Sequence, residues 1–130
     1  MPIPQEAEII VHAWLKDLTR SAAHHDLPAH MQLVSRQVRV VGIPNAGSID
    51  YDGWRLRRFN EFNGKLLQSL NYQLREIINT RDEQIVFSVQ ETMKASNGKS
   101  IVADKDVILQ KEKDGRWRVR YERYDRIKVL

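Results

Sequence analysis

The sequence contains no cysteine, no long apolar run and no strong excess of one charge. Without cysteine, neither disulfide bonds nor thiol chemistry can contribute, which fits a reducing compartment. No stretch approaches the ~20 apolar residues that a membrane-spanning helix needs. The first ten residues also lack the basic and apolar regions of a secretory signal. We therefore expect a cytoplasmic protein with no membrane partner.

The net charge of +4, from 21 basic and 17 acidic residues, is mild. A nucleic-acid partner would be indicated by basic residues clustered with aromatic ones. The best candidate is the alternating set Arg116, Arg118 and Arg120, but acidic residues lie opposite this set in the register expected below. Cross-strand charge pairing on a solvated face explains such a pattern. We therefore expect no nucleic-acid partner.

The chain does contain enough apolar sequence for one hydrophobic core. It has 130 residues, of which 42% are hydrophobic and 29% charged, values that are ordinary for a soluble domain. No internal repeat, low-complexity segment or linker divides it. We predict a single domain over residues 1–130.

The C-terminal third predicts three long antiparallel strands joined by tight turns. Apolar and polar residues alternate along each strand, so each strand has one face that is mostly apolar. Both turns place glycine third, at Gly98 and Gly115, which suits a three-residue hairpin loop with a left-handed last residue. The predicted strands cover residues 83–95, 100–112 and 116–125.

Three-residue loops also fix which side chains lie opposite one another. The first turn sets Phe87 opposite Val107, and the second sets Val107 opposite Tyr121. A two-residue Asn-Gly loop would instead bring Asp104 and Asp106 onto the apolar face, at a high desolvation cost. We therefore predict the three-residue register.

Three charged side chains fall on the apolar face in this register, namely Glu91, Lys105 and Arg123. Lys105 faces Arg123, and Glu91 lies one diagonal step away. One interpretation is an open pocket end that handles a polar group. The other is an ion-pair cluster at the rim of the sheet, half in water, because long charged side chains commonly extend to solvent.

Helical spacing of apolar residues predicts three helices before these strands. Asp26 is a good N-cap for the second helix, and Asn63-Gly64 predicts a bend or break in the third. Glu76 faces inward by alternation and therefore marks a bulge or a rim position. The predicted helices cover residues 5–23, 26–35 and 53–69, with strands over 37–41 and 72–79 and a brief strand near Ile49 and Tyr51.

This order of elements resembles one known superfamily. It combines Trp14-to-Leu18 before His25-Asp26-Leu27, Tyr51-x-Gly53 before the third helix, and Asp114-to-Val119 opening the last strand. Together these features resemble the nuclear transport factor 2-like superfamily, which includes ketosteroid isomerases and SnoaL-like polyketide cyclases. The resemblance implies an α+β fold and frequent homodimers. In that fold a curved, mostly antiparallel sheet of about 5–6 strands wraps around three N-terminal helices, forming a cone with a central pocket.

A pocket of this kind suggests candidate site residues. A carboxylate in an apolar-walled pocket has a raised pKa, so Glu91 is the candidate catalytic acid or base. Aromatic side chains at such spacing are more often part of a plain core than of a ligand site. The candidate ligand-binding residues are Trp14, Trp54, Tyr72, Lys105, Tyr121 and Arg123.

The histidines His24, His25 and His30 lie near Asp26, but the adjacent pair points in different directions. A metal site needs three or four converging ligands, so we expect no metal. The glycines form no dinucleotide fingerprint, and we expect no cofactor.

Three functions remain open. The first is binding of a small, largely apolar ligand with a polar end. The second is a SnoaL-like cyclase, isomerase or dehydratase that uses Glu91; the isomerase aspartate of the resembling family would fall at or beside Gly42, where no side chain accepts a proton. The third is a homodimeric interaction module that uses the outer sheet face, around Val86, Val102, Ile108 and Tyr124.

Overall fold

The computed structural model describes residues 4–64 and 66–130. Its order is two helices, a strand, a third helix and four long strands, as the sequence predicts apart from the brief strand near Ile49 and Tyr51. The elements are α1 (Pro4–Ala23), α2 (Leu27–Met31), β1 (Val34–Val41), α3 (Tyr51–Asn63), β2 (Leu67–Arg81), β3 (Gln84–Ala95), β4 (Ser100–Lys111) and β5 (Trp117–Val129).

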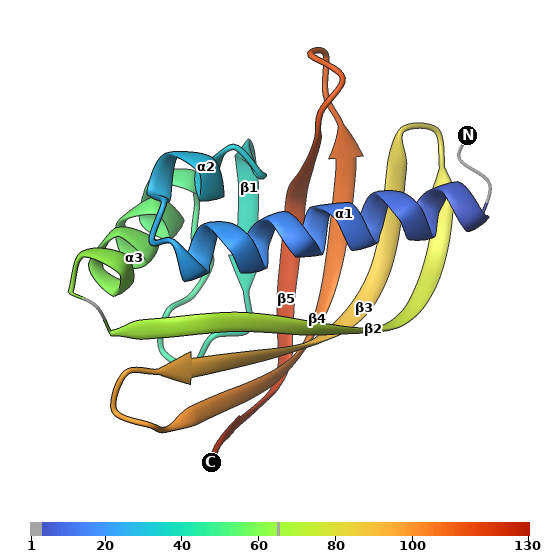
Figure 1. The fold of residues 1–130 in the computed structure, drawn as a ribbon. Helices are drawn as coiled ribbons and strands as arrows, with labels where there is room; N and C mark the ends of the chain where they lie inside the picture. The colour runs from blue at the N-terminus through green and yellow to red at the C-terminus, as the bar shows by residue number, and fades with distance from the viewer. Residues whose placement is uncertain (1–3, 65) are drawn as a thin grey trace.

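The five strands form one curved sheet in the order β1-β5-β4-β3-β2. The long strands pair antiparallel with their neighbours, whereas β1 pairs parallel with β5. Helix α1 crosses the inner face of the sheet, and α2 and α3 lie together at one end (Figure 1). The chain is therefore α+β, with a mostly antiparallel sheet wrapped around helices, as predicted.

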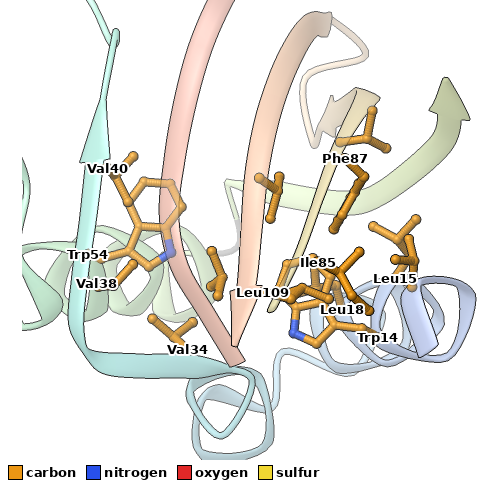
Figure 2. Close-up of a cluster of buried hydrophobic side chains, with 14 of the residues drawn as sticks. Trp14, Leu15, Leu18, Val34, Val38, Val40, Trp54, Ile85, Phe87 and Leu109 are labelled. Carbon is orange, nitrogen blue, oxygen red and sulfur yellow. The ribbon is translucent and has the colours of Figure 1, made fainter. Parts of the chain in front are cut away.

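The main hydrophobic core lies between α1, β1 and the inner face of the sheet. Figure 2 shows Trp14, Leu15 and Leu18 of α1 close to side chains of β3 and β4. The Trp14 and Phe87 rings meet edge to face, with centroids 6.2 Å apart. Such aromatic pairs add roughly 0.5–1.5 kcal/mol beyond the area that they bury.

The third helix is shorter than predicted. It begins after Asp50, whose carboxylate accepts a hydrogen bond from the Gly53 amide at 2.9 Å, and it ends at Asn63 before Gly64. Residues 67–70 belong to β2 rather than to the helix. Glycine weakens a helix interior, which explains the break. Helical spacing also places Leu56, Phe59 and Phe62 on one apolar face, but only Phe62 is buried, since Leu56 is 58% and Phe59 42% exposed.

Other local predictions need smaller corrections. The N-cap of α2 is Asp26, as predicted, although this helix ends at Met31. Ile49 forms an isolated bridge to Val40, whereas Tyr51 opens α3 instead of a strand. The register of β2 shifts beside Glu76, which is exposed, so the predicted bulge is confirmed.

Both glycine turns have the predicted three-residue register. The Ala95 amide donates to the Lys99 carbonyl at 2.8 Å, and the Glu112 amide donates to the Arg116 carbonyl at 2.9 Å. Phe87 consequently pairs with Val107, as predicted. The left-handed φ of 86° at Gly98 and 84° at Gly115 explains why glycine occupies the third loop position.

The first of two irregularities in β5 overturns the register predicted beyond the second turn. The pairing shifts between Leu109–Val119 and Ile108–Tyr121, so Val107 faces Glu122 instead of Tyr121. The same shift sets Lys105 opposite Tyr124 instead of Arg123, and the second shift follows between Lys105 and Asp104. A bulge inserts one residue and so exchanges the faces of the strand that follows. The physical gain is clear, because the unbulged register would bring the cations Lys105 and Arg123 together at a buried position.

Candidate functional site

Three charged side chains from adjacent strands form a buried ion network inside the sheet. The Lys105 ammonium lies 3.0 Å from Glu91 Oε2 and 3.3 Å from Glu122 Oε1. Each side chain is no more than 4% exposed. The interpretation of a half-solvated rim cluster is therefore wrong, and the charges lie in the interior. We call this group the buried polar network; its members are Glu91, Lys105, Glu122, Tyr72, Tyr124 and Arg58.

Two tyrosines complete the hydrogen bonds of Glu91. Tyr72 donates to Oε2 at 2.7 Å, and Tyr124 donates to Oε1 at a longer 3.4 Å. The Lys105 ammonium also lies over both rings, 5.0 Å from the centroid of Tyr124 and 5.6 Å from that of Tyr72. An ammonium at this distance from an aromatic face is attracted by the ring. Both oxygens of the Glu91 carboxylate are thus already engaged.

The helix α3 contributes a buried arginine to the network. Trp54, Arg58 and Phe62 recur at intervals of four, so they lie on one face of the helix. The Arg58 guanidinium stacks 4.6 Å above the Trp54 ring and pairs with Glu61 at 2.8 Å. Arg58 itself is 2% exposed.

The network separates two groups of buried apolar residues. Trp54 belongs to the main core, whereas Phe62 belongs to a smaller cluster with Ala22, Leu67 and Leu70. Arg58 lies between Trp54 and Phe62 on the helix, and Tyr72 packs against both clusters. The interior therefore has a polar seam between two apolar regions.

Electrostatics hold Glu91 in the charged form. Burial alone would raise the pKa of Glu91, but the charges of Lys105 and Arg58 and the hydrogen bond from Tyr72 outweigh burial. The pKa of Glu91 falls to about 2 as a result. A carboxylate with so low a pKa is a weak base at neutral pH, and it is not protonated to act as an acid.

The other groups keep their ordinary charge states as well. Burial would lower the pKa of Lys105, but the charges of Glu122 and Glu91 raise it well above its usual value. Burial, with the neighbouring Glu91 charge, raises the pKa of both Tyr72 and Tyr124. At neutral pH the network therefore contains the ionised Glu91 carboxylate, the Lys105 ammonium and two neutral phenols.

Two polar atoms of the network have no hydrogen-bond partner among the described residues. They are Glu122 Oε2 and Arg58 Nε, and both are fully buried. Leaving a buried donor or acceptor unsatisfied costs roughly 1–3 kcal/mol, and more when the group is charged. Such exceptions are rare enough in folded proteins to need an explanation.

The structure brings four of the seven predicted site residues into this region. Glu91, Lys105, Tyr72 and Trp54 all belong to it or contact it. Trp14 lies instead in the main core, where its indole donates to the Leu33 carbonyl at 3.1 Å.

Tyr121 and Arg123 do not lie on the inner face, which corrects the prediction. The bulge at Arg120 turns both outward, and Arg123 pairs with Asp106 at 2.6 Å on the outer face. Glu122 and Tyr124 take their inner places, so the outer position predicted for Tyr124 is also wrong. Sequence reasoning missed both of these residues and Arg58. For Arg58 a signal existed, because it lies midway between Trp54 and Phe62 at helical spacing.

The histidines have separate structural partners. His25 Nε2 lies 2.8 Å from the Leu67 carbonyl oxygen, whereas His30 Nδ1 lies 2.9 Å from Ser21 Oγ. Within residues 4–64 and 66–130, no three His, Asp or Glu side chains gather as metal ligands would. Among the same residues, no helix has both the length and the apolar character needed to cross a membrane.

Comparison with known proteins identifies the fold. No family model matches the chain, and no curated protein matches it in sequence. Solved structures, however, superimpose on nearly the whole chain. A protein of unknown function from Shewanella oneidensis, described as nuclear transport factor 2-like, has a TM-score of 0.76 and 16% identity, over 94% of this chain and 98% of that one. The chain has the nuclear transport factor 2-like fold.

Two further structures have the nuclear transport factor 2-like fold seen here. A ketosteroid isomerase-like protein from Erwinia carotovora has a TM-score of 0.71 at 15% identity, over 94% of this chain and 96% of that one. A conserved protein from Planctomyces limnophilus has a TM-score of 0.78 at 10% identity, over 95% and 97%. Since one fold supports many functions, function must be argued from the site.

Proposed function

We propose that the protein binds a small, largely apolar molecule with a hydroxyl or similar polar end at the buried polar network. The observation that carries this proposal is the pair of unsatisfied buried atoms, Glu122 Oε2 and Arg58 Nε. A hydroxyl can donate to such a carboxylate oxygen, and a hydroxyl oxygen can accept from such a guanidinium N–H. A polar group that reached either atom would relieve the cost of burying that atom without a partner.

The surroundings favour an apolar body for this molecule. Phe62, Leu67 and Leu70 form a buried cluster beside Arg58, and Trp54 lies on its other side. Ligand sites in proteins are generally apolar with a few well-placed polar groups, which is the composition found here.

Binding is a better proposal than acid–base catalysis by Glu91. Its low pKa and its three hydrogen-bond donors stabilise the ionised carboxylate, which is the opposite of the raised pKa expected from the sequence. An acid–base role for Glu91 therefore stays a prediction that the geometry does not favour.

The test compares 2-naphthol with naphthalene, which lacks the hydroxyl. Replacing the carboxylate in Glu122→Met should weaken 2-naphthol binding by about tenfold to a hundredfold, because a hydrogen bond to a charged group contributes ~1.5–3 kcal/mol. Naphthalene binding should change little, since it uses only the apolar walls. Fluorescence titration measures both.

The matched control is Glu76→Met, which removes an exposed carboxylate of β2. Binding of both compounds to this variant should equal that of the parent protein. If 2-naphthol and naphthalene bind the parent equally well, or neither shows saturable binding, the proposal is wrong.

The homodimer expected through the outer sheet face also stays a proposal. Val86 and Ile108 pair across β3 and β4 on that face and are partly exposed, which supplies some apolar area. Light scattering at micromolar concentration tests the homodimer. A monomeric mass would show that this proposal is wrong.

A further inference from the structure

A groove with a volume of about 790 Å³ lies on the outer side of the sheet, opposite the buried polar network. It is formed where β1, the start of α3, β4 and β5 meet. Ile108 lines it from β4, and its neighbours Val107 and Leu109 point into the core, which places the groove on the outer face. Its functional groups include Arg36, Arg39, Arg120, Tyr51, Tyr121 and Asp52.

Its three arginines, Arg36, Arg39 and Arg120, are exposed. Among the described residues, Arg36, Arg39 and Arg120 form no ion pair, whereas Arg118 and Arg123 on the same face each pair with a carboxylate. Arg36 lies 4.7 Å above the Tyr51 ring, which holds its guanidinium beside the groove. Converging guanidinium groups suit phosphate, which they bind through paired N–H donors.

The floor of the groove offers a surface for a flat ring. Tyr121 pairs with Ile108 on β4 and with Arg39 on β1, so these three residues form a row across the outer face. The bulge at Arg120 turns Tyr121 outward into this row. A partly exposed tyrosine beside an aliphatic side chain provides a stacking surface for a base or similar ring.

Acidic groups in the same groove narrow the class of ligand. Asp52 is exposed there, and Asp50 accepts a hydrogen bond from the Gly53 amide at 2.9 Å. Carboxylates repel a phosphate polymer, whose affinity rests on many cationic contacts. They do accept hydrogen bonds from hydroxyl groups. Arginines, carboxylates and a tyrosine ring in one groove therefore favour a small molecule with one phosphate group, a flat ring and free hydroxyls.

We propose that this outer groove binds a nucleoside phosphate, with its phosphate on Arg36, Arg39 and Arg120 and its ring on Tyr121. The hydroxyls of the sugar would donate to Asp52. This site is separate from the buried network and does not depend on the function proposed there.

The experiment is calorimetric titration of the whole protein with AMP and with adenosine. AMP should bind at least about tenfold more tightly than adenosine, because only AMP carries the phosphate. Arg120→Ala should weaken AMP binding by about tenfold or more and leave adenosine unchanged. Tyr121→Ala should weaken both compounds, while Tyr121→Phe should retain them because the ring remains.

Arg57→Ala is the matched control, since Arg57 is also an exposed arginine without an ion pair among the described residues, but it lies outside the groove. It should bind AMP like the parent protein. Equal weakening by Arg57→Ala and Arg120→Ala would mean unspecific charge attraction and would overturn the proposal. The proposal would also be overturned if a single-stranded oligonucleotide bound tightly and AMP did not bind. The same holds if Arg120→Ala changed only the oligomeric state.

Discussion

The two faces of the same three strands hold their ion pairs in opposite environments. On the inner face, Lys105 lies between Glu91 and Glu122, with every member almost fully buried. On the outer face, Arg123 pairs with Asp106 at 2.6 Å, a shorter distance, yet the two side chains are 54% and 33% exposed. Geometry alone would rank the outer pair as the stronger.

Burial therefore determines what such a pair contributes to stability. An exposed pair is screened by water and contributes ~0–1 kcal/mol, whatever its distance. A buried pair has a large desolvation cost, so its net contribution is small, but losing one partner leaves an uncompensated charge. The inner network is therefore a point of vulnerability, and it is also the place where unsatisfied atoms can recognise a ligand.

The largest loss of stability is expected for Lys105→Met on the inner face. Removing the ammonium leaves two carboxylates buried without a cation between them, so the free energy of unfolding should fall by about 3–5 kcal/mol. Since domains of this size have a total stability of about 5–15 kcal/mol, the variant should still be measurable by urea unfolding.

A double variant separates charge from shape in this prediction. Glu91→Gln combined with Lys105→Met removes a positive and a negative charge together, so the combined loss should be smaller than the sum of the two single losses. Strict additivity would show that the network does not act as a unit.

The pH dependence of stability should show a smaller effect of the buried Glu91 carboxylate. The folded pKa of Glu91 is about 2, below its usual value of 4.5, so the unfolded chain binds the proton more readily. The stability from this group is fully present above about pH 4.5 and is lost as the pH falls toward 2. Glu91→Gln should flatten the pH dependence in that window, as measured by chemical unfolding at successive pH values.

The control for the acid experiment is Glu76→Gln on the exposed part of β2. Its curve should follow that of the parent protein, apart from a constant offset. An equal loss of slope in both variants would assign the pH dependence to general charge and not to the buried carboxylate.

The comparison also explains how far the sequence could predict the molecule. The turns at Gly98 and Gly115 have local signals, because each requires a left-handed residue, and the pairing close to them follows from loop length. The bulge at Arg120 has no such signal, since the alternation of Trp117, Val119 and Tyr121 runs straight through it. What selects the bulge is a contact distant in sequence, between Lys105 and Glu122.

The candidate site was predictable where alternation along one strand fixes the face on which a side chain lies. Alternation within β3 and β4 correctly placed Glu91 and Lys105 on the inner face, because neither strand has a shift in register against the other. In β5 the residues before the bulge, Trp117 and Val119, were placed correctly, whereas residues 121–124 after it were placed on the wrong face. Arg58 was missed for a different reason. Its spacing from Trp54 and Phe62 indicates a buried helix face, but charged side chains are seldom buried.

The smallest change in the free energy of unfolding is expected for the exposed pair of Arg123 and Asp106. Arg123→Met replaces a cationic side chain by methionine, as Lys105→Met does, but on the outer face. Because Arg123 and Asp106 remain accessible to water, the free energy of unfolding should change by no more than about 1 kcal/mol, and added salt should reduce even that difference. Urea unfolding of this variant beside Lys105→Met tests burial directly. Comparable losses in the two variants would mean that contact distance, and not desolvation, determines what these ion pairs contribute.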